Sequence, residues 1–127
     1  MTKTKQQQIG TWGEEKAASF LLQRGYEVID RNFSIPKKGE IDIIAWSTKP
    51  HFGKTLCFVE VKTRERSDGS AERAVGKKKM SALKSVGWLY CLKHGIDIDH
   101  TPIQFEQVSL CMVHGRFEIN HYEIPMG

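Results

Sequence analysis

The amino-acid sequence predicts an α/β fold in which a central mixed sheet is flanked by helices. Three observations predict it. Two segments carry apolar residues at helical spacing, and five segments are rich in β-forming residues. They follow one another in the order helix, three strands, helix and two strands, or αβββαββ. Polar stretches that contain glycine or proline separate most of these segments and supply the turns.

The first helix is expected from Gln6 to about Gly25, where the glycine is well placed to end it. Its apolar residues recur at helical spacing and are Ile9, Trp12, Ala17, Phe20 and Leu21. Because a helix turns about 100° per residue, Glu14 falls within about 20° of Leu21 and points toward the packed side. Glu14 therefore either binds the backbone or a lysine near the helix start, or belongs to a functional site.

Three strands are expected next. Tyr26 to Phe33 is rich in β-forming residues, and the apolar run Ile41 to Trp46 follows it after the turn sequence Pro-Lys-Lys-Gly. These two segments should form a hairpin. The third strand, Thr55 to Thr63, comes after a polar segment that contains a proline and a glycine.

The second half of the chain is expected to add one long helix and two strands. Ala74 to Leu92 carries apolar residues at helical spacing, and Gly95 closes the helix. The strands Ile103 to Val113 and Phe117 to Ile124 are joined by His-Gly-Arg, whose glycine suits a short hairpin connection.

Length and composition favour a single domain over residues 1–127, because 127 residues with 39% hydrophobic content are enough for one core. The three cysteines, Cys57, Cys91 and Cys111, lie in apolar surroundings without metal-ligand spacing and are expected to be reduced core residues. Residues 1–8 are polar, and no apolar run is long enough to span a membrane. A soluble, cytoplasmic protein is expected.

Charged residues occur in two of the expected strands where their neighbours are apolar. In the stretch Gly-Glu-Ile-Asp-Ile-Ile, a period of two places Glu40 and Asp42 on one face and the isoleucines Ile41 and Ile43 on the other. In the stretch Phe-Val-Glu-Val-Lys, the same period places Glu60 and Lys62 on one face of the strand. Two neighbouring strands therefore each present charge.

If these strands pair, Asp42 and Glu60 could lie side by side, and their carboxylates repel each other unless a cation or a proton intervenes. Mg²⁺ prefers carboxylate, water and phosphate oxygens, and it needs only one or two protein carboxylates. Lys62 would project toward the metal and could orient the attacking water or offset phosphoryl charge. The alternative is an ordinary cross-strand pairing of these three residues on a solvated face of the sheet.

These residues resemble the signature of the PD-(D/E)xK nuclease superfamily, an acidic residue on one strand followed by Glu-x-Lys on the next. More closely, the chain is similar, nearly end to end, to the YraN family of small bacterial predicted endonucleases, which resemble archaeal Holliday junction resolvases. The specific blocks are residues 39–44 and 58–64. The remaining blocks are Gly13-Glu14 with Ala17, Arg31-Asn32, Ala74-Val75 with Lys79, and Gln104-Phe105-Glu106.

The resemblance implies a restriction endonuclease-like fold and a metal-dependent DNA endonuclease that hydrolyses phosphodiester bonds, with selectivity for branched or junction DNA. It implies that Asp42 and Glu60 bind Mg²⁺ or Mn²⁺, and that Lys62 is the catalytic lysine. Glu14 would be an additional catalytic acid near the metal. Glu40 shares the face of Asp42 but lies at the entrance of its strand, where it could equally shape the turn.

Basic residues gather directly after the proposed catalytic strand. Residues 62–84 contain eight basic and three acidic residues, a net charge of +5. The residues expected to contact DNA phosphates are Arg64, Arg66, Arg73, Lys77, Lys78 and Lys79. A solvated helix face with surplus lysines is the alternative. No base-reading motif is visible, which favours recognition of DNA shape over recognition of sequence.

Two other classes of protein stay open: a nucleic-acid-binding module that keeps the nuclease fold without turnover, and an interaction domain whose charges only keep it soluble. Cutting both strands of a symmetric junction would suit a homodimer. The five histidines lack metal-ligand spacing and are expected at the surface, whereas the three tryptophans are expected in the core. Glu106 stands where the family usually has aspartate, and a purely structural role is considered for it.

Overall fold

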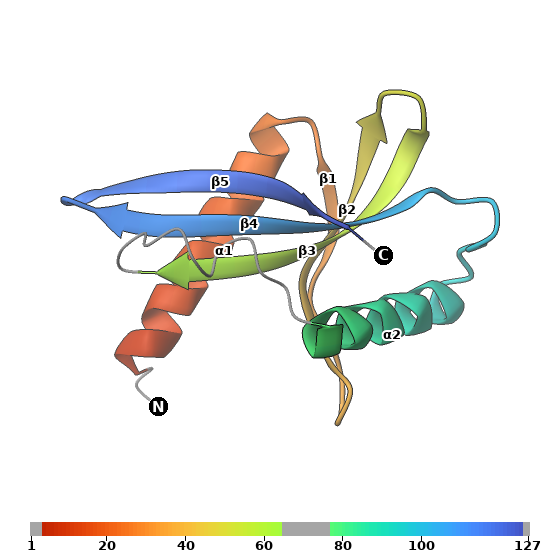
Figure 1. The fold of residues 1–127 in the computed structure, drawn as a ribbon, viewed down its shortest axis with the longest axis horizontal. Helices are drawn as coiled ribbons and strands as arrows, with labels where there is room; N and C mark the ends of the chain where they lie inside the picture. Colours follow the sequence, from red (N-terminus) through yellow and green to blue (C-terminus); the bar gives the residue numbers. More distant parts are fainter. Residues whose placement is uncertain (1–3, 65–76, 126–127) are drawn as a thin grey trace.

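The structure is a computed structural model that describes residues 4–64 and 77–125 (Figure 1). The described part contains two helices and five strands, which are α1 (Lys5–Gln23), β1 (Glu27–Ile35), β2 (Gly39–Lys49), β3 (Gly53–Arg64), α2 (Lys77–Lys93), β4 (Ile103–Val113) and β5 (Arg116–Ile124). The predicted order αβββαββ and the α/β class are confirmed. Ala74, where the second helix was expected to start, lies outside the described residues.

The five strands form one mixed sheet whose order follows the chain, β1-β2-β3-β4-β5. β3 and β4 run parallel, while the other neighbouring pairs are antiparallel. A parallel pair needs a long crossover, and the segment that contains α2 provides it. The β1–β2 hairpin and the C-terminal β4–β5 hairpin that the sequence predicts are both present.

α1 begins and ends with local hydrogen bonds that its sequence supplies. The backbone N–H of Gln7 donates to Oγ1 of Thr4 (3.1 Å), and the N–H of Thr4 donates to Oε1 of Gln7 (2.9 Å), which forms a capping box. After the helix, the N–H of Tyr26 donates to the carbonyl of Leu21 (3.0 Å). Gly25 lies between them with a φ of +87°, which glycine adopts without strain. The prediction that Gly25 ends the helix is confirmed.

The two helices pack against opposite faces of the sheet, and each face has its own hydrophobic cluster. The α1 cluster consists of Ala17, Ala18, Leu21, Tyr26, Ile43, Ala45, Cys57, Val59, Val108 and Leu110. The α2 cluster consists of Ile41, Ile44, Leu56, Phe58, Met80, Leu83, Val86, Tyr90, Cys91, Phe105 and Ile124. Successive residues of β3 alternate between the two clusters, as a strand buried on both faces requires.

β2 and β3 diverge near the middle of the sheet. The last pair in their register is Ile43 with Val59. Beyond this pair, residues 39–41 of β2 pair with β1, whereas residues 60–64 of β3 pair with β4. Figure 1 shows that the β1–β2 hairpin continues downward while β3 turns to the left beside β4. We call this divergence, formed by residues 39–42 and 60–64, the fork.

The prediction that Ile41 and Ile43 share one face of the strand is wrong. Ile41 belongs to the α2 cluster and Ile43 belongs to the α1 cluster. The two-residue period fails where β2 leaves β3, and β1 is irregular at the same place, because Asn32, which lies opposite Asp42, has a φ of +54°. Asp42 lies between the two isoleucines, at the base of the fork.

Other predictions about the core are confirmed. All three cysteines are buried thiols. Trp12 packs on the α1 cluster, while Trp46 and Trp88 pack on the α2 cluster, although all three rings are only partly buried. In residues 4–64 and 77–125, no helix is long and apolar enough to cross a membrane.

Candidate functional site

The carboxylate of Asp42 lies in the fork and bridges its two branches. Its Oδ2 accepts a hydrogen bond of 2.8 Å from the backbone N–H of Val61. The β2–β3 register ends at Ile43 and Val59. The Asp42 oxygen therefore accepts from a β3 N–H that has no β2 backbone partner, because it lies beyond the last paired residues. The hydrogen bond therefore fixes the Asp42 carboxylate at the point where the strands separate.

Other acidic side chains surround Asp42. Burial is the main cause that raises the pKa of Asp42 to about 7, and the hydrogen bond from Val61 opposes it. The negative charges of Glu60, Glu14 and Glu40 add to the rise. These acids come from α1 and from both branches of the fork. A carboxyl group with a pKa near 7 is poised to hold a proton or to yield it to a cation at neutral pH.

Glu60 contacts helix α2 through Lys79. The Lys79 Nζ lies 3.2 Å from Oε1 of Glu60. The side chain of Glu60 is 16% exposed and that of Lys79 is 54% exposed, so the ammonium group reaches a mostly buried carboxylate from the solvent. The described residues therefore do not form the solvated cross-strand pairing of Asp42, Glu60 and Lys62 that the sequence left open.

Lys62 is half-buried on the same branch of the fork as Glu60. In this part of β3, Val59 and Val61 pack with the α1 cluster. The period of two therefore directs Glu60 and Lys62 together toward the face that α2 covers.

Glu14 faces the fork from helix α1. Burial raises its pKa, the charge of Arg31 lowers it, and the charges of Glu40 and Glu15 raise it again. Its Oε1 is buried and has no hydrogen-bond partner among the described residues. The prediction that Glu14 points inward is confirmed. A buried carboxylate oxygen without a partner is the kind of atom that a water, a ligand or a cation satisfies.

Helix α1 approaches β3 very closely beside Glu14. A Cβ atom built on Gly13 would lie 2.0 Å from Oγ1 of Thr63. No other residue fits this contact unless the Thr63 side chain, the helix or the strand moves, because real Cβ atoms do not approach other atoms so closely. Glycine at this position therefore lets α1 hold Glu14 near the branch that carries Glu60 and Lys62.

A divalent cation fits this donor set only with water or phosphate as further ligands. Within residues 4–64 and 77–125, no group of three or more His, Cys, Asp and Glu side chains is arranged to hold a metal ion. Mg²⁺, however, takes one or two protein carboxylates and completes its coordination with water and phosphate oxygens. Asp42 and Glu60 supply that number, and Glu14 adds a buried acceptor oxygen.

Glu40 is exposed at the start of β2. Its charge raises the pKa of both Asp42 and Glu14, which shows that it belongs to the same group of acids. Its position next to the β1–β2 turn is equally clear, because it pairs with Ser34 near the tip of the hairpin.

Comparison with known sequences identifies the family of this chain. Residues 13–119 match the model of the family described as Uncharacterised protein family UPF0102. The chain belongs to the UPF0102 family. Relatives include UPF0102 proteins from Syntrophomonas wolfei, 36% identical across 90% of this chain and 93% of the relative, and from Alkaliphilus oremlandii, 34% identical across 91% and 94%. A third, from Koribacter versatilis, is 38% identical across 87% and 73%.

The basic residues of this UPF0102 protein are described only in part. Arg66 and Arg73 lie outside the described residues, as does the side chain of Lys77. Lys78 and Lys79 are exposed in the first turn of α2. At the end of β3, Arg64 is half-buried, and its Nε has no hydrogen-bond partner among the described residues.

A second buried polar cluster surrounds Glu106 of β4. The Glu106 side chain is 1% exposed. Its Oε1 lies 2.8 Å from the Tyr26 hydroxyl and 2.7 Å from Nε2 of His121, and its Oε2 lies 2.8 Å from Nζ of Lys49 and 2.9 Å from Nε2 of Gln104. Burial raises the pKa of Glu106, but the hydrogen bonds from His121, Lys49 and Tyr26 outweigh burial and lower it.

This Glu106 cluster was not predicted from the sequence, although a structural role for the glutamate itself was considered. The prediction that all histidines lie at the surface is wrong for His121, whose side chain is only 14% exposed. The reason is that His121 lies on β5 opposite Val108, which places its ring beside Glu106 on the neighbouring strand.

Proposed function

We propose that this UPF0102 protein is a metal-dependent DNA endonuclease of the PD-(D/E)xK type. The observation that carries the proposal is the convergence of Glu14, Asp42 and Glu60 at the fork, with Lys62 on the branch of Glu60. The resemblance of these residues to the YraN family supports the same assignment.

Hydrolysis of a phosphodiester bond needs a positioned water molecule and compensation of the charge that develops on the phosphate. Asp42 and Glu60 would hold Mg²⁺ or Mn²⁺, which when bound supplies positive charge and makes water more acidic. Lys62 would orient the attacking water or neutralise a phosphate oxygen. Glu14 would orient water through its buried oxygen, which has no other partner among the described residues.

DNA would be held beside these acids by positive charge. Lys79 already lies at Glu60, and Arg64 ends the strand that carries Glu60 and Lys62. Contacts of this kind bind phosphates irrespective of base sequence and weaken as the salt concentration rises. The proposed substrate is therefore DNA recognised by its structure, such as branched DNA.

A second candidate function is a nucleic-acid-binding module that does not cut. One observation favours it: the Lys79 Nζ lies 3.2 Å from Oε1 of Glu60, so a lysine already offsets the charge that a cation would otherwise offset. Such a module would bind DNA with the same salt dependence but would need no divalent ion.

The test is cleavage of supercoiled plasmid, single-stranded DNA and a four-way junction in Mg²⁺ or Mn²⁺. We expect Asp42→Ala and Lys62→Ala to lower the rate by at least about a hundredfold, on the scale seen when catalytic groups are removed. Asp97→Ala is the matched control, because Asp97 is 61% exposed in the segment after α2 and far along the chain from the acids. Cleavage that survives both substitutions would contradict the assignment of Asp42 and Lys62 to the catalytic site. Salt-sensitive binding without cleavage would favour the binding module.

A further inference from the structure

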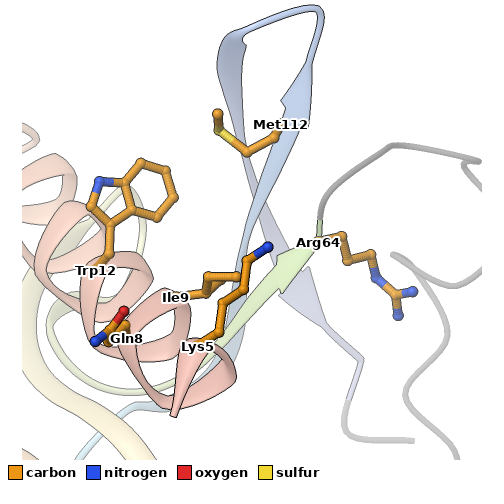
Figure 2. A pocket seen from close by; sticks show the side chains of 6 residues that line it. All are labelled: Lys5, Gln8, Ile9, Trp12, Arg64 and Met112. Carbon is orange, nitrogen blue, oxygen red and sulfur yellow. The ribbon is translucent and has the colours of Figure 1, made fainter. Parts of the chain in front are cut away.

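A groove that shares Arg64 with the fork lies between the start of α1 and the ends of β3 and β4. Its volume is about 670 Å³, and its lining residues are Lys5, Gln8, Ile9, Trp12, Arg64 and Met112 (Figure 2). Ile9, Trp12 and Met112 give it an apolar and partly aromatic wall, and none of the described lining residues carries a carboxylate. Figure 2 shows Lys5 extending from α1 toward the strands. Positive charge therefore lies beside the apolar wall.

Aromatic surface and positive charge continue from the groove along α1. The rings of Trp12 and Phe117 pack edge to face with their centres 5.3 Å apart, and Phe117 remains 40% exposed on β5. The Lys16 Nζ lies 5.8 Å from the centre of the Phe117 ring. Exposed aromatic rings between lysines are typical of surfaces that bind single-stranded nucleic acid, because bases stack on the rings and phosphates contact the lysines.

The groove adjoins the fork through the contact between α1 and β3. Trp12 precedes the glycine that packs against Thr63, and Arg64 follows Thr63 on the strand. In Figure 2 the Arg64 side chain points away from α1. By the period of β3, this is the side that also carries Glu60 and Lys62. Arg64 lines the groove and follows Lys62 by two residues on β3, so a DNA strand that passes these acids along β3 meets the groove at the end of the strand.

We propose that the groove binds an unpaired base of the DNA beside the bond that is cut, with the base against Trp12 and Met112 and a neighbouring phosphate at Lys5. This inference rests on the proposed nuclease function and names its substrate class: DNA with an unpaired segment, such as a flap or a single-stranded gap. A paired base is covered by its stacked neighbours, whereas an unpaired base exposes a face that an aromatic wall can bind.

The test is binding of a fluorescently labelled thymidine oligonucleotide, compared with a blunt duplex of equal length, in EDTA so that neither is cut. We expect Trp12→Ala to weaken single-strand binding about tenfold, because stacking of one base on an aromatic ring contributes an effect of that size. Duplex binding should change less than about twofold, because it depends on phosphate contacts elsewhere. Trp12→Phe, which keeps an aromatic face, should retain most of the single-strand affinity.

Two further variants guard against a change in folding. Because Trp12 also packs on the α1 cluster, Lys5→Ala and Met112→Ala alter the groove without removing a core ring. Thermal unfolding is followed for each variant. Phe52→Ala is the matched control, because Phe52 is a 68% exposed ring at the β2–β3 turn, outside the groove. If Trp12→Ala, Lys5→Ala and Met112→Ala all bind the single strand as tightly as the wild type, the inference is overturned.

Cleavage assays separate a failure of this inference from a failure of the proposed function. Single-strand binding that depends on Trp12, in a protein that cuts no DNA, would support the groove and remove the nuclease. Equal cleavage of flap and paired DNA by wild type and Trp12→Ala would support the nuclease and overturn the groove. A changed oligomeric state of Trp12→Ala with unchanged DNA binding would assign the groove to a second copy of the chain, which also overturns the inference.

Discussion

The Lys49 Nζ lies 2.8 Å from Oε2 of Glu106 in a place where the lysine is 18% exposed and the glutamate is 1% exposed. The two residues come from β2 and β4, so the ion pair spans β3, which lies between those strands. The Tyr26 hydroxyl hydrogen-bonds to both partners. Because both charges are largely removed from water, each is tolerated only while the other is present.

Glu106→Gln should therefore lower the free energy of unfolding by about 3 kcal/mol, because it leaves the Lys49 ammonium group buried without its counter-charge. Urea denaturation at pH 7 measures this difference. The pKa of Glu106 is lowered in the folded protein, so its contribution is present above its ordinary value of 4.5 and is lost as the pH falls below it. The difference between wild type and variant should shrink accordingly in acid.

Glu123→Gln provides the control for this prediction. Glu123 pairs with Glu106 across β4 and β5, but its own side chain is exposed. We expect its substitution to change stability by less than about 0.5 kcal/mol. Equal losses in the two variants would mean that the Lys49–Glu106 pair has no special role.

Asp42→Asn should stabilise the protein at alkaline pH when no divalent ion is present. The pKa of Asp42 is raised from 3.8 to about 7, so between these values the folded state holds a proton that the unfolded state has lost. Stability therefore falls as the pH rises through this window. Asparagine removes the titration and keeps an oxygen for the N–H of Val61. We expect a gain on the order of 2 kcal/mol at pH 8 in EDTA, which disappears near about pH 4.

Urea denaturation of wild type and Asp42→Asn at both pH values measures this gain. The carboxylate of Asp99, exposed in the segment after α2, is not part of the acid group around Asp42, so Asp99→Asn is a suitable reference for a general effect of charge removal. Wild type that is as stable as Asp42→Asn at pH 8 would contradict the assigned burial of this carboxylate.

Mg²⁺ should raise the unfolding temperature of the wild type, because an ion that binds only the folded state stabilises it by mass action. At a concentration about a hundred times the dissociation constant, the gain is about 2.7 kcal/mol, which corresponds to several degrees for a chain of this size. Calorimetry with increasing Mg²⁺ measures the shift. Asp42→Asn should lose most of it, and Asp97→Asn should keep it. Equal shifts in the wild type and Asp42→Asn would place the ion elsewhere.

Lys79→Ala should affect DNA binding more than stability. Its ion pair with Glu60 involves a side chain that is 54% exposed, and exposed pairs contribute less than about 1 kcal/mol. If Lys79 contacts a phosphate, the slope of log affinity against log salt should fall by about one. Anisotropy titrations at several salt concentrations measure the slope. Lys93→Ala, in the last turn of the same helix, should leave it unchanged, and an unchanged slope for both variants would exclude the contact.

The parts of this protein that could be predicted from sequence depend on local signals. The end of α1 at Gly25 follows from a residue type that favours a positive φ. The inward direction of Glu14 follows from the helical period. The placement of Glu60 and Lys62 on the same face follows from the period of a strand. Each of these requires only residues that are close together in the chain.

The remaining features depend on pairings between distant segments. The fork arises because one half of β2 pairs with β3 and the other half does not, which no local period contains. A carboxylate in an apolar strand was a signal for Asp42, and the same signal was present at Glu106. Its partners Lys49 and His121 could not be assigned, because they lie on other strands and become neighbours only through the register of the sheet.

Gly13→Ala should destabilise the protein although alanine favours helices. A Cβ at this position would lie 2.0 Å from Oγ1 of Thr63 and 3.2 Å from its Cβ, so the Thr63 side chain, α1 or β3 must move. Overpacking of this kind costs about 2 kcal/mol. Gly10→Ala, on the same helix with nothing within 4 Å of the added atom, should instead gain up to about 1 kcal/mol. Thr63→Ala removes the closest atom and should restore most of the loss in the double variant. Urea denaturation of the wild type, Gly13→Ala, Thr63→Ala and the double variant measures the coupling between residues 13 and 63. Additive effects would mean that the two residues are not in contact.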